Sequence, residues 1–302
     1  MSTLHRAHRM KSYNRRQLRT GLLFVSPWLI GFCAFTLYPT VASLYYSLTR
    51  YDILTPPRFI GLDNYVALTR DGDFRRAVFN QLYYVTIAVP LSLVTAFGLA
   101  LLLNSNLRLR SVWRTIFFLP SITPVVAVAL VWGWIYNSQY GLLNSLLNTF
   151  GVQSVPWLTS ERLVKPSLVA ISLWASGGTM IIFLAALQDV PQHLYEAARI
   201  DGANKLHELR FITVPMVSPA ILFTLITGMI DAFNYFALPW VMTQGGPAGA
   251  STFYPLYLYN NGFLFFKMGY ASAMAWIMFL VTVACAILVF RTVGRWAFYG
   301  SD

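Results

Sequence analysis

Six long apolar runs divide the chain, and they constrain its fold more than any other feature. They lie at approximately residues 22–48, 79–103, 115–137, 164–187, 216–242 and 271–293. A helix needs about 20 mainly apolar residues to cross the hydrocarbon core of a bilayer. Hydrophobic residues make up 57% of the sequence and charged residues only 11%, which leaves too little polar surface for a soluble globule. The sequence therefore predicts an all-α polytopic membrane protein with six transmembrane helices.

The basic N-terminus could belong to a secretory signal, and the first apolar run decides against it. Residues 1–21 contain several Arg and Lys residues and no acid. A signal peptide has an apolar core of about 7–15 residues and a small-residue cleavage site, whereas this run is far longer and lacks that site. Phe32 precedes Cys33 where a lipoprotein signal requires a small residue. We interpret the run as a first transmembrane helix, bent near Pro39, that opens a membrane domain over residues 22–302.

The positive charge predicts the orientation of the chain. Six spans place both termini on one side, together with the loop 104–114 and the polar segment 188–215. Most of the 22 Lys and Arg residues lie in these four regions, so the positive-inside rule predicts that all four are cytoplasmic. Topology thus explains the net charge of +11. Because no basic stripe with interleaved aromatic residues accompanies that charge, nucleic acid is not an expected partner. The two cysteines, Cys33 and Cys285, are expected to be small buried hydrophobic residues rather than a disulfide or metal site.

The polar segment between the fourth and fifth runs has the features of a docking element. Gly202 suits the left-handed C-terminal cap of a first short helix, and a second short helix can follow over residues 204–210. Ala197 and Ala198 would let a partner's backbone approach closely, and the charge of Glu196 could fix its orientation. The alternative is an ordinary solvated loop between two helices.

The amino-acid sequence of this segment resembles the EAA signature of permease subunits in binding-protein-dependent ABC importers. Glu196-Ala-Ala is followed by three residues, Gly202, nine further residues and Ile212-Thr-Val-Pro215, with Val214 where leucine is commoner. The runs Phe59–Tyr65, Thr243–Pro247 and Phe266–Ser272 extend the resemblance over nearly the whole chain after residue 20. The sequence is most similar to the sugar-type branch, which includes maltose and glycerol-3-phosphate permeases. The resemblance implies that the ATPase-coupling residues are Glu196, Ala197, Ala198, Asp201 and Gly202.

The same resemblance implies a fold, a location and a set of partners. The fold would be that of a type I importer permease in a bacterial plasma (inner) membrane. The partners would be a second permease, most often a different gene product that forms a heterodimer, two ATP-binding subunits and an extracytoplasmic solute-binding protein. The sequence contains no Gly-Lys dipeptide and hence no Walker A loop. We therefore expect ATP and Mg²⁺ on the partner subunits, no cofactor or metal on this chain, and no enzymatic activity of the chain by itself.

Polar residues in two apolar runs form a candidate substrate site. Asp231 carries a charge inside the fifth run, which is costly in a bilayer and marks a functional candidate. Thr224 and other polar residues flank it at helical spacing, and a similar set lies in the fourth run beside Gly177-Gly178. The predicted substrate-binding residues are Asp231, Asn234, Tyr235, Thr227, Ser172, Trp174, Ser176 and Thr179. Hydroxyl, amide and aromatic groups suit a neutral sugar or polyol. The alternative is that these residues serve helix packing.

Two functions of other classes remain as alternatives. A secondary carrier or channel would work without ATP and would have no use for the segment 196–215. A membrane-bound enzyme would need catalytic groups at depth, and the apolar runs contain no cluster of carboxylates or histidines. Prolines within or beside the runs favour broken helices around a translocation path over a passive anchor.

Overall fold

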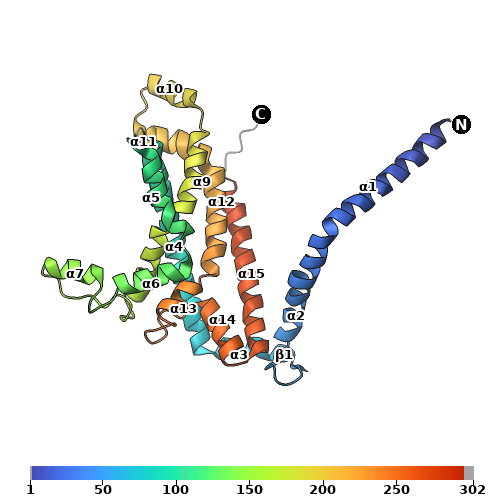
Figure 1. Cartoon of the computed structure of the whole chain (residues 1–302), viewed down its shortest axis with the longest axis horizontal. Coiled ribbons are helices and arrows are strands. Elements are labelled where there is room, and N and C mark those ends of the chain that lie inside the picture. Colours follow the sequence, from blue (N-terminus) through green and yellow to red (C-terminus); the bar gives the residue numbers. More distant parts are fainter. Residues whose placement is uncertain (1, 106, 296–302) are drawn as a thin grey trace.

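The computed structural model describes residues 2–105 and 107–295, with side chains from residue 17 onward, and is almost wholly helical (Figure 1). The α-helices are α1 (Ser2–Phe32), α2 (Tyr38–Ser47), α3 (Asp63–Arg70), α4 (Gly72–Asn104), α5 (Arg110–Ile122), α6 (Val125–Ile135), α7 (Leu142–Thr149), α8 (Val164–Trp174), α9 (Gly177–Gln188), α10 (Gln192–Ile200), α11 (Lys205–Glu208), α12 (Val214–Phe233), α13 (Ala237–Met242), α14 (Tyr254–Tyr259) and α15 (Met268–Val293). Three π-helical turns are η1 (Cys33–Leu37), η2 (Leu209–Thr213) and η3 (Asn260–Leu264). Strands β1 (Thr49–Arg50) and β2 (Arg58–Phe59) pair antiparallel, with Thr49 opposite Phe59.

The predicted membrane spans are present, and two of them are broken. Four helical segments in the described chain are long and apolar enough to cross a bilayer: Gln17–Ser47, Gly72–Asn104, Lys205–Met242 and Met268–Val293. Two bent pairs complete the set of six, α5 with α6 at 100° and α8 with α9 at 44°. The breaks agree with the expectation, drawn from the prolines within or beside the runs, that some of the spans are broken helices.

Local chemistry explains both breaks. Thr123 is extended (φ −75°, ψ 132°) between α5 and α6, because the residue before Pro124 is disfavoured in the helical region. Between α8 and α9, Gly177 lies against the backbone of α5. A Cβ at this position would lie 2.1 Å from the carbonyl oxygen of Phe117, so only glycine permits this approach. The break between α8 and α9 thus lies against α5, about one and a half turns before the break between α5 and α6.

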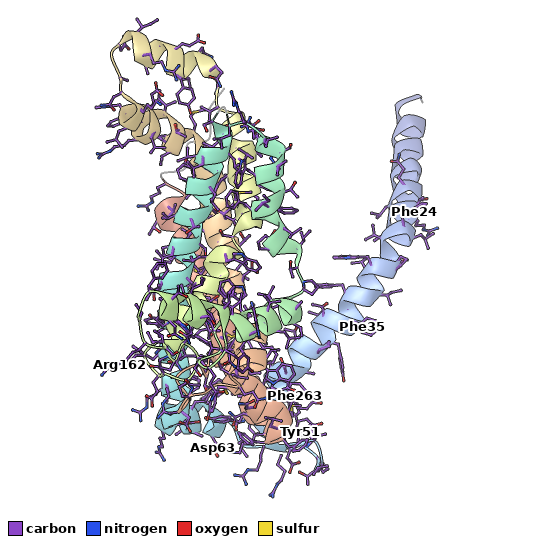
Figure 2. All side chains as sticks on the ribbon, turned by 60° about the vertical axis from the view of Figure 1, so that its left-hand side comes forward. Phe24, Phe35, Tyr51, Asp63, Arg162 and Phe263 are labelled. Atoms are coloured by element: carbon purple, nitrogen blue, oxygen red, sulfur yellow. The ribbon has the colours of Figure 1, made fainter. Side chains whose placement is uncertain are left out.

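The first span stands away from the other helices. Its α2 part packs on α15, while α1 extends outward from the bundle (Figures 1 and 2). Phe24 and Phe35 on this span are 83% and 84% exposed. The π-helical turn η1 directly precedes Pro39, where we expected a bend. Cys33 is exposed, so the expectation that it is buried is wrong for this chain.

Helix α4 is the centre of the remaining bundle and contacts α8, α9 and α12. Ala96 and Ala100 on α4 are fully buried, and such small residues let neighbouring helices approach closely. Helices α10 and α11 lie at one end of the bundle, while α3, α13 and α14 lie at the other (Figure 1). The EAA segment, which begins on α10, therefore lies at the opposite end of the bundle from α3, α13 and α14.

Candidate coupling helix and transport cavity

Helix α10 presents the EAA segment at one end of the molecule (Figure 1). It ends at Ile200, and Gly202, two residues beyond, has a φ of +80°. The N–H of Gly202 donates to the carbonyl of Arg199 (3.1 Å), and the N–H of Ala203 donates to that of Ala198 (2.9 Å). This pair of hydrogen bonds is the Schellman motif, in which glycine takes the left-handed position without steric cost. The predicted glycine cap is confirmed.

The surface at this end of the molecule exposes both charged and large apolar side chains. Glu196, Ala197 and Asp201 are exposed, and Ala198 is half-buried. Within the described chain, Glu196 has no basic side chain within ion-pair distance. The elements α10, α11 and η2 also expose large apolar side chains, namely Ile200 (86%), Leu206 (70%) and Phe211 (63%). Exposed apolar residues around an unpaired carboxylate are typical of a protein-binding surface.

Two side-chain contacts hold α10 to the next elements. Arg199 Nε donates to Glu208 Oε1 at 2.8 Å, and the hydroxyls of Tyr195 and Thr213 are 3.0 Å apart. The hydrogen bond and the charge of Glu208 raise the pKa of the Arg199 guanidinium. The sequence analysis missed both contacts, although opposite charges across a turn gave a signal for the first. The second short helix, α11, continues through η2 into α12, so the segment is joined directly to a membrane span.

A cavity of about 360 Å³ lies inside the bundle, between α4, the two broken spans, α12 and α13. Five of the eight predicted substrate-binding residues line it: Ser172, Ser176, Thr179, Asp231 and Tyr235. Thr224 of the same polar stripe lines it as well. The sequence analysis missed its other polar lining residues, Tyr84, Ser92, Ser121 and Thr123. The two polar sets predicted on separate spans therefore meet in one cavity.

Tyr84 organises the polar wall of this cavity. Its hydroxyl is 2.6 Å from the hydroxyl of Ser172, and its ring stacks on Tyr235 with centroids 3.9 Å apart. The Ser176 hydroxyl is buried and has no hydrogen-bond partner among the described residues, whereas the Tyr235 hydroxyl is buried beside those of Tyr84 and Ser172. Buried hydroxyls are normally paired, so Ser176 has an unused hydrogen-bonding group at the wall of the cavity.

Asp231 differs from the expectation of a buried charge, because its side chain is exposed while it also lines the cavity. An exposed Asp231 carboxylate avoids the free-energy cost of a charge in the bilayer only if water or another chain, rather than lipid, contacts it. Three predicted residues lie outside the lining. The Thr227 hydroxyl donates to the Phe223 carbonyl at 2.9 Å, and the Asn234 amide donates to the Ile230 carbonyl at 2.9 Å. Trp174 packs edge-on against Trp132.

The cavity offers hydrogen bonds and ring faces. Hydroxyls of Ser, Thr and Tyr donate and accept, one carboxylate accepts, and the stacked tyrosines present apolar faces. In the part of the chain that the structure describes, no group of three His, Cys, Asp or Glu could hold a metal ion. The arrangement suits recognition of a hydroxylated solute.

Comparison with known proteins identifies the family. The family described as "Binding-protein-dependent transport system inner membrane component" matches residues 88–297. The chain belongs to this family. Its members are permease subunits of ABC transporters, which confirms the resemblance carried by the EAA segment. The permease is accordingly a multi-pass protein of the inner membrane.

Relatives and solved structures of this permease cover almost its full length. It is 38% identical over 292 residues to the probable ABC transporter permease protein YesP of Bacillus subtilis, covering 95% of this chain and 94% of the relative. It is 33% identical to the trehalose/maltose transport system permease protein MalF of Thermococcus litoralis, covering 93% and 95%. A chain from the crystal structure of a bacterial alginate ABC transporter with an alginate pentasaccharide-bound periplasmic protein has a TM-score of 0.82 at 23% identity, covering 96% and 99%. The last comparison shows the same fold.

Proposed function

We propose that this permease forms part of the translocation path of an ATP-driven importer for a sugar or sugar-like solute. The observation that carries the proposal is helix α10, in which Glu196 stands exposed and unpaired among the described residues at the end of the bundle. Its role would be to bind the ATPase subunits, which hold ATP and Mg²⁺. Glu196, Ala197, Ala198, Asp201 and Gly202 are the proposed coupling residues.

The cavity supports a solute rich in hydroxyl groups. Ser176 offers an unpaired hydroxyl at the cavity wall, and the stacked rings of Tyr84 and Tyr235 offer apolar faces for the C–H side of a sugar. The relatives agree with this class, since one is named for trehalose and maltose and one structural neighbour belongs to an alginate transporter. An extracytoplasmic binding protein would deliver the solute to this cavity.

The proposed mechanism is alternating access. Closure of the ATPase subunits would move α10 on the cytoplasmic side. Because α11, η2 and α12 are continuous from Lys205 to Phe233, that movement would reach the cavity wall at Thr224 and Asp231. The cavity would then open to alternate sides.

A second permease would complete the path. Asp231 lines the cavity and is exposed in the single chain, so a further chain is needed to exclude lipid from this side. The resemblance favours a different permease, which gives a heterodimer. The span α1, which stands away from the bundle (Figure 2), is also available for contacts with that partner.

The test is affinity purification of the chain from its native membrane in mild detergent, followed by mass spectrometry of the copurified proteins. We expect an ATP-binding subunit and a second permease. Glu196→Lys should reduce recovery of the ATPase by at least about tenfold, because it reverses an unpaired charge at the contact. Glu161→Lys, also exposed but on the loop before α8, is the matched control. Recovery of the chain alone, with transport in vesicles that lack ATP, would replace the proposal by a secondary carrier.

A further inference from the structure

A second cavity of about 530 Å³ lies at the end of the bundle opposite α10. Its walls come from the segment after β1, from α3, from α14 and η3, and from the start of α15. Figure 2 shows Tyr51 and Phe263, which belong to these regions, at that end of the molecule. None of the residues assigned to coupling or to the transport cavity lines it.

One close backbone approach builds this cavity. The N–H of Gly269 donates to the carbonyl of Tyr51 at 3.1 Å. A Cβ on Gly269 would lie 2.1 Å from the carbonyl oxygen of Thr49, so the approach requires glycine. The contact holds the start of α15 against β1 and brings Lys267 and Arg50 to the same cavity.

The two cations of the cavity are unpaired in the described chain. Arg50 and Lys267 are exposed and have no carboxylate within ion-pair distance. Asp71, a carboxylate that lines the same cavity, is already occupied. Its Oδ1 accepts two backbone N–H groups at the start of α4, and its Oδ2 accepts the hydroxyls of Tyr257 (2.6 Å) and Tyr270 (2.5 Å). The cations therefore retain donors for an external anion.

Asp52 supplies the opposite charge. Its Oδ1 accepts both the N–H and the hydroxyl of Thr55, at 2.8 and 2.7 Å. Among the described residues no hydrogen bond reaches its Oδ2, although the side chain lines the cavity. The cavity thus combines two free cations with one free carboxylate oxygen. A ligand that carries both an anion and an ammonium group complements this set.

The surroundings of the cavity place it at a membrane boundary. Phe263, Leu264, Phe265 and Phe266 are 56%, 56%, 58% and 51% exposed. They directly precede Lys267 and the apolar span that begins at Met268, and two of them line the cavity. Aromatic residues at the end of a span, followed by a cation, are typical of the level of lipid headgroups. The zwitterion within reach of this cavity is therefore a phospholipid headgroup.

We propose that this cavity binds the headgroup of an amine-bearing phospholipid such as phosphatidylethanolamine. The phosphate would contact Arg50 and Lys267, the ammonium would contact Asp52, and the acyl chains would lie along the exposed aromatic residues. The bound lipid would tie the start of α15 to the β1 segment. This inference requires that the protein is embedded in a membrane and does not depend on which solute it transports.

The test is native mass spectrometry of the full chain, with any subunits that copurify, after exchange into micelles containing one phospholipid at a time. We expect the wild type to retain phosphatidylethanolamine over phosphatidylcholine, whose methylated amine cannot donate hydrogen bonds. The double variant Arg50→Gln and Lys267→Gln should lose at least about tenfold in retention. Asp52→Asn keeps the oxygen that binds Thr55 and should bind both lipids equally.

Arg58→Gln is the matched control, because Arg58 pairs with Arg50 across the two strands but does not line the cavity. It should retain lipid as the wild type does, and thermal unfolding of all variants should coincide. Equal retention by the double variant would overturn the proposal. If soluble glycerophosphoethanolamine binds as tightly as the lipid, the site recognises a soluble molecule and the membrane source is wrong.

Discussion

The EAA segment and the transport cavity are built by opposite kinds of contact. The Arg199–Glu208 and Tyr195–Thr213 contacts join residues 9 and 18 positions apart. In the cavity, Tyr84 contacts Ser172 across 88 positions, and neighbouring Gln81 donates to the Ala232 carbonyl across 151. The segment is thus a local structure with an open outer face, whereas the cavity exists only when four spans are assembled. Substitutions should therefore act on partner binding in the first region and on solute recognition or stability in the second.

One continuous element connects the two regions. Helix α11 begins beside α10, and α11, η2 and α12 follow one another without interruption from Lys205 to Phe233. Thr224 and Asp231 on this segment line the cavity. A movement of α11 can therefore reach the cavity without passing through a loop, while α10 is joined to α11 by residues 201–204 and by the contact between Arg199 and Glu208.

The largest expected effect is on solute uptake after removal of cavity groups. Asp231→Ala with Tyr235→Ala should lower uptake of radiolabelled disaccharides in proteoliposomes by about tenfold or more, because several hydrogen bonds to the solute are lost. Thr227→Ala with Asn234→Ala is the matched pair, since both side chains bond to their own helix. ATPase binding should be unchanged in both. If both pairs retain full uptake, the polar stripe serves packing.

A second effect should fall on the stability of the assembled spans. Gly177→Ala should destabilise the permease by about 1–3 kcal/mol, because its Cβ would collide with the backbone of α5 and the helices would have to move apart. The neighbouring Gly178→Ala is the control, since its Cβ would meet Ser121 at an ordinary 3.7 Å. Thermal unfolding in detergent measures both. Equal midpoints for the two variants would show that α9 and α5 are less tightly packed than the structure indicates.

The contrast also explains what could be predicted from the sequence. The Gly202 cap depends on spacing along one helix, so it was predictable. Helical spacing also predicted Thr224, Asp231 and Tyr235 at the cavity, but it wrongly added Thr227 and Asn234. Tyr84 and Ser121 were not, because nothing in α4 or α5 alone indicates that they face the fourth and fifth runs. Pro124 gave a signal for the break between α5 and α6, yet hydropathy alone counts both helices as one span. The expectation that Asp231 is buried was wrong for the same reason, because the exposure of a side chain depends on how the helices pack.

A smaller effect should stay within the coupling end. Gly202→Ala should cost about 1 kcal/mol, because alanine disfavours the left-handed conformation at φ +80°. We expect faster hydrogen exchange at the last turn of α10 and weaker retention of the ATPase, with the cavity unaffected. Gly98→Ala on α4 is the control, since its Cβ would meet nothing within 4 Å and alanine favours a helix. Faster exchange in Gly98→Ala than in Gly202→Ala would contradict the local character of this end.

The smallest expected effect concerns the contact between Arg199 and Glu208. Exposed ion pairs contribute little to stability. The Arg199 side chain is 65% exposed and that of Glu208 is 13% exposed, so Arg199→Glu should leave unfolding nearly unchanged, and Glu208→Arg should destabilise the permease somewhat more. Both changes should loosen α10 from α11 and raise the ratio of ATP hydrolysed to solute transported. The double exchange restores opposite charges and should restore that ratio, most clearly at low salt, where screening is weak. If the double exchange transports no better than the singles, the ion pair does not transmit movement, and the Tyr195–Thr213 contact must hold α10 alone.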